Sequence, residues 1–256
     1  VIAPSFAGAL AGVAIFGIGG AYMVAGGLSV LSFLAVLRLP KVPSVNRNGP
    51  TNPFVEIYNG VRYVSERKHL RRLLISSFLV IMFGFNYVVF IPALVKDTFD
   101  LDNDTWVGLL SSASSVGALA VGFWLARRAD QPGRWRVMVI TGTIFGTGVV
   151  ALAVAPDFWL AMAVVVAIGG GTSGYQTLSN AIALNLAEPS HQGRVQSLLQ
   201  LSFAGFGIAA LPLGLLAEAI GRRQTMVAMG LAATVAIVVY WVLEGSDAET
   251  IEAWIP

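Results

Sequence analysis

Long apolar runs without charged residues recur along the whole chain, and polar connections separate them. A bilayer core about 30 Å thick is crossed by roughly 20 residues of apolar helix. The first run is short, and the sixth is long enough for a helix that is tilted or extends beyond the membrane. The pattern therefore predicts an all-α integral membrane protein with eight transmembrane helices. They lie near residues 2–16, 20–37, 73–95, 106–126, 137–155, 158–186, 195–217 and 225–243.

The runs are typical of helices and not of barrel strands. Strands of an outer-membrane barrel alternate apolar and polar residues over about 10 residues, whereas these runs are continuous. Glycines such as Gly142 and Gly146 lie inside the runs at a spacing of four. Between membrane helices this spacing lets two backbones approach closely, so we expect tight packing.

Composition narrows the class of protein. Charged residues make up 12% of the chain, whereas a soluble domain carries about 25%. The absence of cysteine excludes disulfides and thiolate chemistry. His69 and His191 fall in polar connections and do not form a ligand pair. Because no catalytic constellation, metal cluster or phosphate loop is recognisable, we expect no enzyme, no cofactor and no nucleic-acid partner.

The distribution of basic residues predicts the orientation. Thirteen of the 16 lysines and arginines fall in the connections 38–72, 127–136 and 187–194, which lie on one side of an alternating path. Because lysine and arginine accumulate on the cytoplasmic side of membrane proteins, we expect these connections in the cytoplasm. With eight spans, both ends of this chain lie there too, in a cell (cytoplasmic) membrane.

The long connection contains a further predicted helix. Thr51-Asn52-Pro53 is a helix-start signal, and apolar residues then recur at helical spacing beside Arg62, Arg67 and Lys68. We predict an amphipathic helix along the membrane surface or, alternatively, a short helix packed on the protein's own cytoplasmic face. The predicted domains are two helices (1–37), a cytoplasmic linker (38–72), a six-helix bundle (73–243) and a cytoplasmic tail (244–256).

Several stretches have a recognisable pattern: Asn52-Pro53, Gly60 to Val64, Gly193 to Ser197 and Pro212 to Gly221. With the order of two helices, a basic linker and six helices, they resemble spans five to twelve of the major facilitator superfamily. The branch they resemble is that of the bacterial drug and siderophore exporters, which includes the enterobactin exporter and macrolide efflux pumps. The resemblance implies a partial major facilitator fold whose partner is the set of N-terminal helices that this chain lacks.

The resemblance also implies a function. Such proteins export small amphiphilic molecules across the cytoplasmic membrane by alternating access of two helical bundles. The alternative is a membrane protein without transport activity, either a truncated protein or a scaffold partner.

One cytoplasmic connection resembles the signature of the superfamily, in which an acidic residue beside arginines holds two helices together in one transport state. The match is degraded, because eight residues separate Gly122 from the acidic residue instead of four, and Gln131 replaces an arginine. An ordinary solvated loop is the alternative. The predicted conformational latch consists of Asp130, Gly133, Arg134 and Arg136.

The polar residues within the spans are neutral. Amides at bilayer depth must face protein or water, so they are either interhelical hydrogen-bond partners or part of a cavity. By resemblance, the third and sixth spans correspond to cavity-lining helices. The predicted substrate cavity therefore includes Asn86, Tyr87, Gln176 and Asn180.

One glycine-rich stretch resembles a nucleotide-binding motif by spacing alone. Residues 169–174 match the glycine spacing of a dinucleotide-binding loop, with Glu188 19 residues after Gly169. Such a loop joins a strand to a helix, whereas this one lies inside a long apolar run, so we expect close helix packing.

All 14 carboxylates fall in connections or the tail, and Glu218 lies nearest a span. We therefore expect no buried carboxylate.

Overall fold

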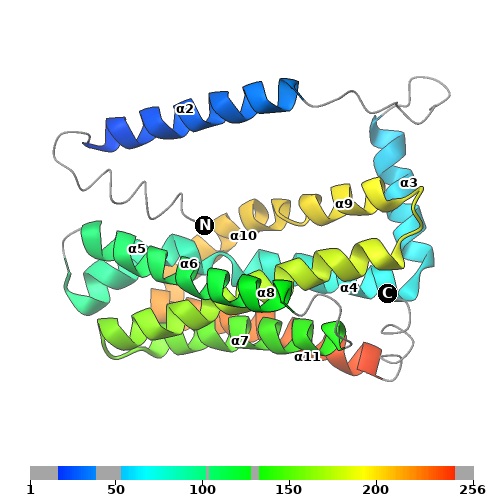
Figure 1. Cartoon of the computed structure of the whole chain (residues 1–256). Coiled ribbons are helices and arrows are strands. Elements are labelled where there is room, and N and C mark those ends of the chain that lie inside the picture. The colour runs from blue at the N-terminus through cyan, green and yellow to red at the C-terminus, as the bar shows by residue number, and fades with distance from the viewer. Residues whose placement is uncertain (1–16, 39–52, 102–103, 128–132, 246–256) are drawn as a thin grey trace.

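The computed structural model describes residues 17–38, 53–101, 104–127 and 133–245, and every regular element in these ranges is a helix (Figure 1). The predicted all-α fold is therefore confirmed. The predicted first span, residue Asp130 and the tail after residue 245 lie outside the described residues.

Six helical segments of the described chain are long and apolar enough to cross a membrane. Two of them, Lys68–Phe99 and Gln192–Ile220, are interrupted, and the other four are single helices. The predicted span at 20–37 coincides with a further helix, α2 (Gly17–Leu37). The elements of the six segments are α4 (Lys68–Leu79), η1 (Val80–Gly84), α5 (Tyr87–Phe99), α6 (Asp104–Ala126), α7 (Arg134–Val154), α8 (Phe158–Leu186), α9 (Gln192–Leu201), α10 (Ala204–Ile220) and α11 (Arg222–Glu244).

Glycines bring the central helices into backbone contact. A Cβ atom on Gly169 of α8 would overlap the carbonyl of Ser114 in α6, and one on Gly117 would overlap the carbonyl of Val166. On another side of α8, a Cβ on Gly171 would lie 2.7 Å from the carbonyl oxygen of Thr141 in α7. Side chains at these positions would force the helices apart. The glycine run thus packs helices, as its place in the sequence predicts.

The two interrupted segments lie next to each other. In the first, α4 passes into the π-helical turn η1, and two residues separate η1 from α5. In the second, the backbone at Ser202 and Phe203 makes three-residue hydrogen bonds, from Gly205 N to Ser202 O and from Phe206 N to Phe203 O. Such irregularities inside helices frequently mark functional sites. The apolar pattern alone predicts two continuous helices here.

The linker helix α3 (Pro53–Glu66) begins where the sequence predicts. It crosses one end of the bundle beside α9 (Figure 1), and Gly60 lies against Leu198 of α9. Its opposite face exposes Val55 and Tyr58. One face therefore packs on the protein's own bundle, which agrees with the second predicted alternative, while the other face keeps an exposed apolar surface.

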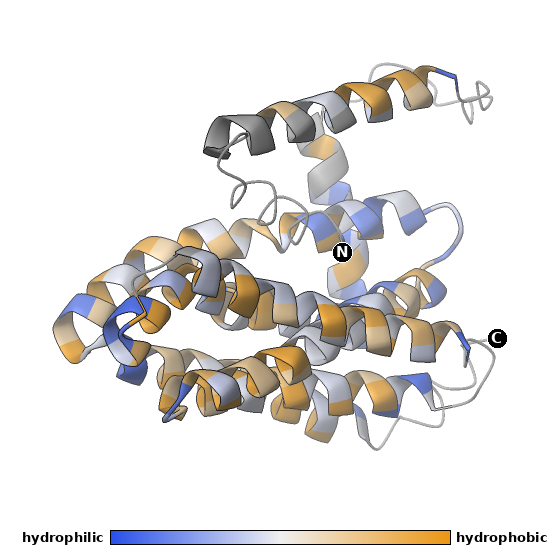
Figure 2. Cartoon of the chain, turned by 60° about the vertical axis from the view of Figure 1, so that its left-hand side comes forward, coloured by the Kyte–Doolittle hydropathy of each residue, from blue (hydrophilic) through white to orange (hydrophobic). Residues whose placement is uncertain are grey.

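The outer surface of the bundle is apolar along its length. Large hydrophobic side chains such as Ile140, Val235 and Val242 are more than half exposed. Hydrophilic residues concentrate at the ends of the helices (Figure 2). Because exposed valine and isoleucine side chains are stable in lipid and unfavourable in water, this distribution fits a protein that spans a membrane.

Candidate functional site

One stripe of α8 carries neutral polar side chains that other helices leave partly open. Its glycines face α6 and α7, and Tyr175 faces α4 through a 3.4 Å contact with Ser77. With 100° of rotation per residue, Gln176 and Asn180 lie seven and eleven residues after Gly169, on the same face of α8 as that glycine and two to three turns further along, and both are half-buried. Asn180 Nδ2 donates to the carbonyl of Gln176 at 2.9 Å. The Gln176 side chain makes no hydrogen bond within the described part of the chain.

Asn86 and Tyr87 are placed differently from the α8 stripe. Asn86 is 1% exposed, and its Nδ2 donates to Met82 O at 2.8 Å and to Phe206 O at 3.3 Å. This amide therefore joins the two interrupted segments at their irregular turns. Tyr87 is also buried, and its ring packs edge-on against Phe145 with centroids 6.2 Å apart. A cavity role for both residues remains a prediction.

The predicted latch is described in part. Gly133 has a φ of 94°, a left-handed conformation that favours glycine, and α7 begins at the next residue. Arg134 is half-buried and has an interaction partner. Arg136 is exposed and lines a groove between α7 and α11. Since Asp130 lies outside the described residues, the latch stays a prediction.

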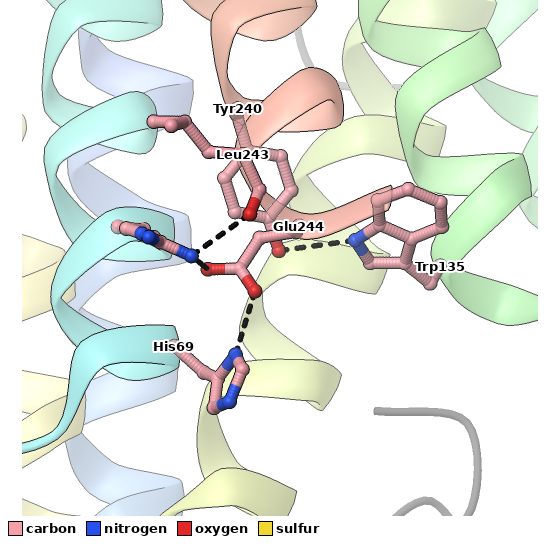
Figure 3. Close-up of polar contacts among 6 residues, drawn as sticks. His69, Trp135, Tyr240, Leu243 and Glu244 are labelled. Atoms are coloured by element: carbon pink, nitrogen blue, oxygen red, sulfur yellow. Dashed lines mark hydrogen bonds and ion pairs between the residues drawn. The ribbon is translucent and has the colours of Figure 1, made fainter. Parts of the chain in front are cut away.

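A buried carboxylate joins the first and last segments of the bundle. Glu244, the last residue of α11, is 0% exposed. Its Oε2 lies 2.6 Å from His69 Nδ1, and its Oε1 accepts a 3.2 Å hydrogen bond from Arg72 (Figure 3). The expectation that no carboxylate is buried is wrong for this residue. Hydropathy places Glu244 after the last span, but the N-terminal turns of α4 cover it.

The cluster around Glu244 continues into the bundle. Arg72 also donates to Leu243 O at 2.8 Å, which satisfies a carbonyl at the end of α11. One turn earlier, the Tyr240 hydroxyl accepts a 3.2 Å hydrogen bond from Trp135 Nε1 of α7 (Figure 3). Three segments, α4, α7 and α11, are thus held together at one end of the bundle by polar side chains.

A second cluster ties α3 to the turn between α8 and α9. The Tyr63 ring stacks on His191 with centroids 4.0 Å apart, and the Arg67 guanidinium lies 3.7 Å from the same ring. Tyr63 Oη accepts a 3.0 Å hydrogen bond from the Glu188 N–H, and the Glu188 carboxylate pairs with Arg67. These contacts anchor the end of α3 to the bundle.

The opposite end of the bundle has its own ion pair. Asp97 at the end of α5 pairs with Arg222 at the start of α11. Arg223 donates to Ala155 O at 2.9 Å, which connects α11 to the turn after α7. Charged side chains thus link neighbouring helices at both ends of the bundle, whereas the polar side chains within the spans are neutral. An apolar-surfaced helical bundle with ion pairs at its ends and helices long enough to cross a bilayer defines a polytopic membrane protein.

Comparison with known proteins agrees with this class. The sequence matches the Major Facilitator Superfamily over residues 1–205. A D-xylose transporter of Levilactobacillus brevis is 25% identical over 159 residues, which cover 53% of this chain and 35% of the transporter. The chain therefore spans about a third of the length of this relative.

Two solved transporters share the fold. The fucose:proton symporter of E. coli superposes with a TM-score of 0.65 at 11% identity, over 86% of this chain and 54% of the symporter. A bacterial homologue of the human lysosomal transporter Spinster superposes with a TM-score of 0.56 at 15% identity, over 92% of this chain and 59% of that protein.

The chain belongs to the major facilitator superfamily, since the family match extends over most of its length. The resemblance noted in the sequence is confirmed at the level of the superfamily. The expectation that the protein is not an enzyme is confirmed by the family and by its transporter neighbours.

Sequence reasoning missed the Glu244 cluster and the Tyr63 cluster. The sequence did contain a signal for the Glu244 cluster. Glu244 directly follows the last apolar run (225–243), and His69 and Arg72 directly precede the third apolar run (73–95). Adjacent span ends with opposite charge can pair if the two helices are neighbours. Which helices are neighbours is not visible in hydropathy.

Proposed function

We propose that this chain is one part of a secondary transporter that moves a small, uncharged organic molecule across the cytoplasmic membrane by alternating access. The observation that carries this proposal is the α8 stripe. Gln176 and Asn180 present amides that other helices leave half-buried, and their neighbourhood lacks formal charge. Amides at bilayer depth are stable when they face a water-filled cavity, and they recognise hydroxyl and carbonyl groups of a solute.

The proposed architecture assigns this chain to spans five to twelve. Residues 1–37 form the last two helices of an N-terminal bundle, 38–72 the linker, 73–243 the C-terminal bundle and 244–256 the tail. The chain covers 54% and 59% of the two solved transporters, which supports a further set of helices in the complete transporter. In such folds the substrate site lies between two bundles, so the α8 stripe forms one wall.

Two substrate classes fit this wall. The resemblance to drug and siderophore exporters favours export of a small amphiphilic molecule, which is our first proposal. The D-xylose transporter among the relatives favours a monosaccharide as the second candidate. A non-transporting scaffold is disfavoured, because the family match and the D-xylose transporter among the relatives both favour transport.

The transport proposal predicts that replacing both Gln176 and Asn180 with alanine lowers transport by the complete protein about tenfold. Loss of two hydrogen bonds to the solute, each worth about 0.5–1.5 kcal/mol, accounts for this factor. Uptake and efflux are measured in cells with a labelled monosaccharide and with a fluorescent amphiphile. The amount of protein in the membrane is measured in parallel.

Thr177→Ala is the matched control, because Thr177 is exposed on another face of the same helix turn. It should transport like the unmodified protein. Equal activity of the double variant would contradict the cavity assignment. Transport of neither probe by the unmodified complete protein would leave the scaffold alternative as the better explanation.

The orientation proposal is tested by cysteine labelling, since the chain has no native cysteine. Gly193 and Pro156 are both exposed and lie at opposite ends of α8 and its flanking turns. Gly193→Cys should resist an impermeant thiol reagent in intact cells and react after permeabilisation. Pro156→Cys should react from outside in intact cells. The reverse pattern would place the basic connections outside the cell.

A further inference from the structure

A groove between α7 and α11 combines apolar walls with an arginine that has no partner among the described residues. Its volume is about 670 Å³, and α7 and α11 run side by side along the lower edge of the bundle, away from α9 (Figure 1). Arg136 is exposed in this groove and makes no hydrogen bond or ion pair within the described part of the chain. The walls consist of Trp135, Val139, Ile140, Trp241 and Val242.

The position of the groove sets its surroundings. Trp135 and Arg136 lie in the first turn of α7, and Trp241 and Val242 lie in the last turn of α11. In the proposed orientation, both ends lie at the cytoplasmic boundary of the membrane. Tryptophan is enriched at this boundary, and Trp241 is 50% exposed there.

The flanking surface belongs to the hydrocarbon region. Ile140 is 58% exposed and Val242 is 65% exposed, and exposed apolar side chains continue along both helices at Ile144 and Val238. A groove with such flanks is open sideways to lipid. A soluble ligand would have to enter it from water across an apolar rim.

We propose that this groove binds one anionic phospholipid of the cytoplasmic leaflet. The phosphate and its anionic headgroup pair with Arg136, and an acyl chain fills the apolar walls between α7 and α11. The ligand class follows from complementarity, because a guanidinium forms charge-assisted hydrogen bonds with phosphate and basic pockets between membrane helices bind anionic headgroups. The function of such a site is to hold α7 and α11 together at the end where the Glu244 cluster lies.

The test measures lipid binding to the purified chain by native mass spectrometry, with phosphatidylglycerol and phosphatidylcholine of identical acyl chains. We expect phosphatidylglycerol to bind about fivefold more tightly, the factor that one basic side chain contributes at a membrane surface. Arg136→Gln should abolish this preference, and Arg136→Lys should retain most of it. Brominated phosphatidylglycerol should quench tryptophan fluorescence, and Trp241→Phe should remove part of the quenching.

Arg127→Gln is the matched control. Arg127 is an exposed arginine on the same side of the membrane, stacked on Phe123 with 4.1 Å to the ring centroid, and outside the groove. It should leave the lipid preference unchanged. An equal effect of the two glutamine variants would show a general attraction of charge and overturn the proposal. Equal affinity of the unmodified chain for both lipids would overturn it as well.

A competing occupant is the acidic tail, which follows Gly245 at the edge of the groove. A chain that ends at Gly245 separates the two explanations. If lipid binds this shortened chain and fails to bind the full chain, the tail and not the lipid occupies the groove, and the proposal is wrong. Equal binding by both chains supports the lipid.

Discussion

Gly169→Ala is expected to destabilise the folded protein by about 3 kcal/mol, at the upper end of the cost of overpacking a core. The added Cβ overlaps the carbonyl group of Ser114, and that group belongs to the backbone of α6. A backbone atom cannot move aside by changing rotamer, so the two helices must separate. Gly117 meets Val166 in the same way from the opposite helix. Unfolding in detergent micelles, followed by circular dichroism, measures the loss.

Gly207→Ala is the control for this prediction. It introduces the same methyl group into a membrane helix, but a Cβ at Gly207 meets no atom within 4 Å. Because alanine is the better helix former by about 1 kcal/mol, this variant should be neutral or slightly more stable. A similar loss in both variants would mean that glycine acts here through flexibility and not through contact between backbones.

Arg72→Met is expected to destabilise the protein by about 2 kcal/mol. Breaking a buried ion pair costs about 3–5 kcal/mol because one charge stays buried without its partner. The lower value is appropriate because the Arg72 side chain is 29% exposed and His69 still contacts the carboxylate. The same unfolding measurement in micelles determines the change.

Two further variants isolate the role of the carboxylate. Arg71→Met removes the neighbouring arginine, which is exposed and whose side chain bonds only to Ser65 O among the described contacts, and it should cost less than about 0.5 kcal/mol. Adding Glu244→Gln to Arg72→Met should recover a large part of the stability, since the buried charge is then gone. If the double variant is as unstable as the sum of the single ones, Glu244 and Arg72 act independently.

The positions of the helices were predictable because a bilayer imposes strong local constraints. Each backbone group in the hydrocarbon region must find its hydrogen bond within the same helix, so an apolar run of sufficient length specifies a helix by itself. The observed helices α6, α7, α8 and α11 agree closely with the predicted runs. The superfamily resemblance was likewise visible in short stretches of sequence, whereas the exporter branch remains a proposal.

The site was predictable only in part. The spacing of four between Gln176 and Asn180 placed them on one face, and the structure leaves that face half-buried. Asn86 had the same residue type and a similar apolar context, yet its amide bonds to Phe206 O in a neighbouring segment. Residue type and local pattern are alike in the two cases, and the difference lies in the helix that packs against each side chain.

The class of protein, the helices and the distribution of charge follow from the order of the amino acids, because each depends on neighbours within one turn or one span. Which glycines touch another backbone, where the helices are interrupted, and whether a charge at a helix end is buried depend on how the helices pack. Glu244 illustrates the reason. Its partners His69 and Arg72 lie 175 and 172 residues away in the chain, so its burial depends on α4 packing beside α11, which no local pattern specifies.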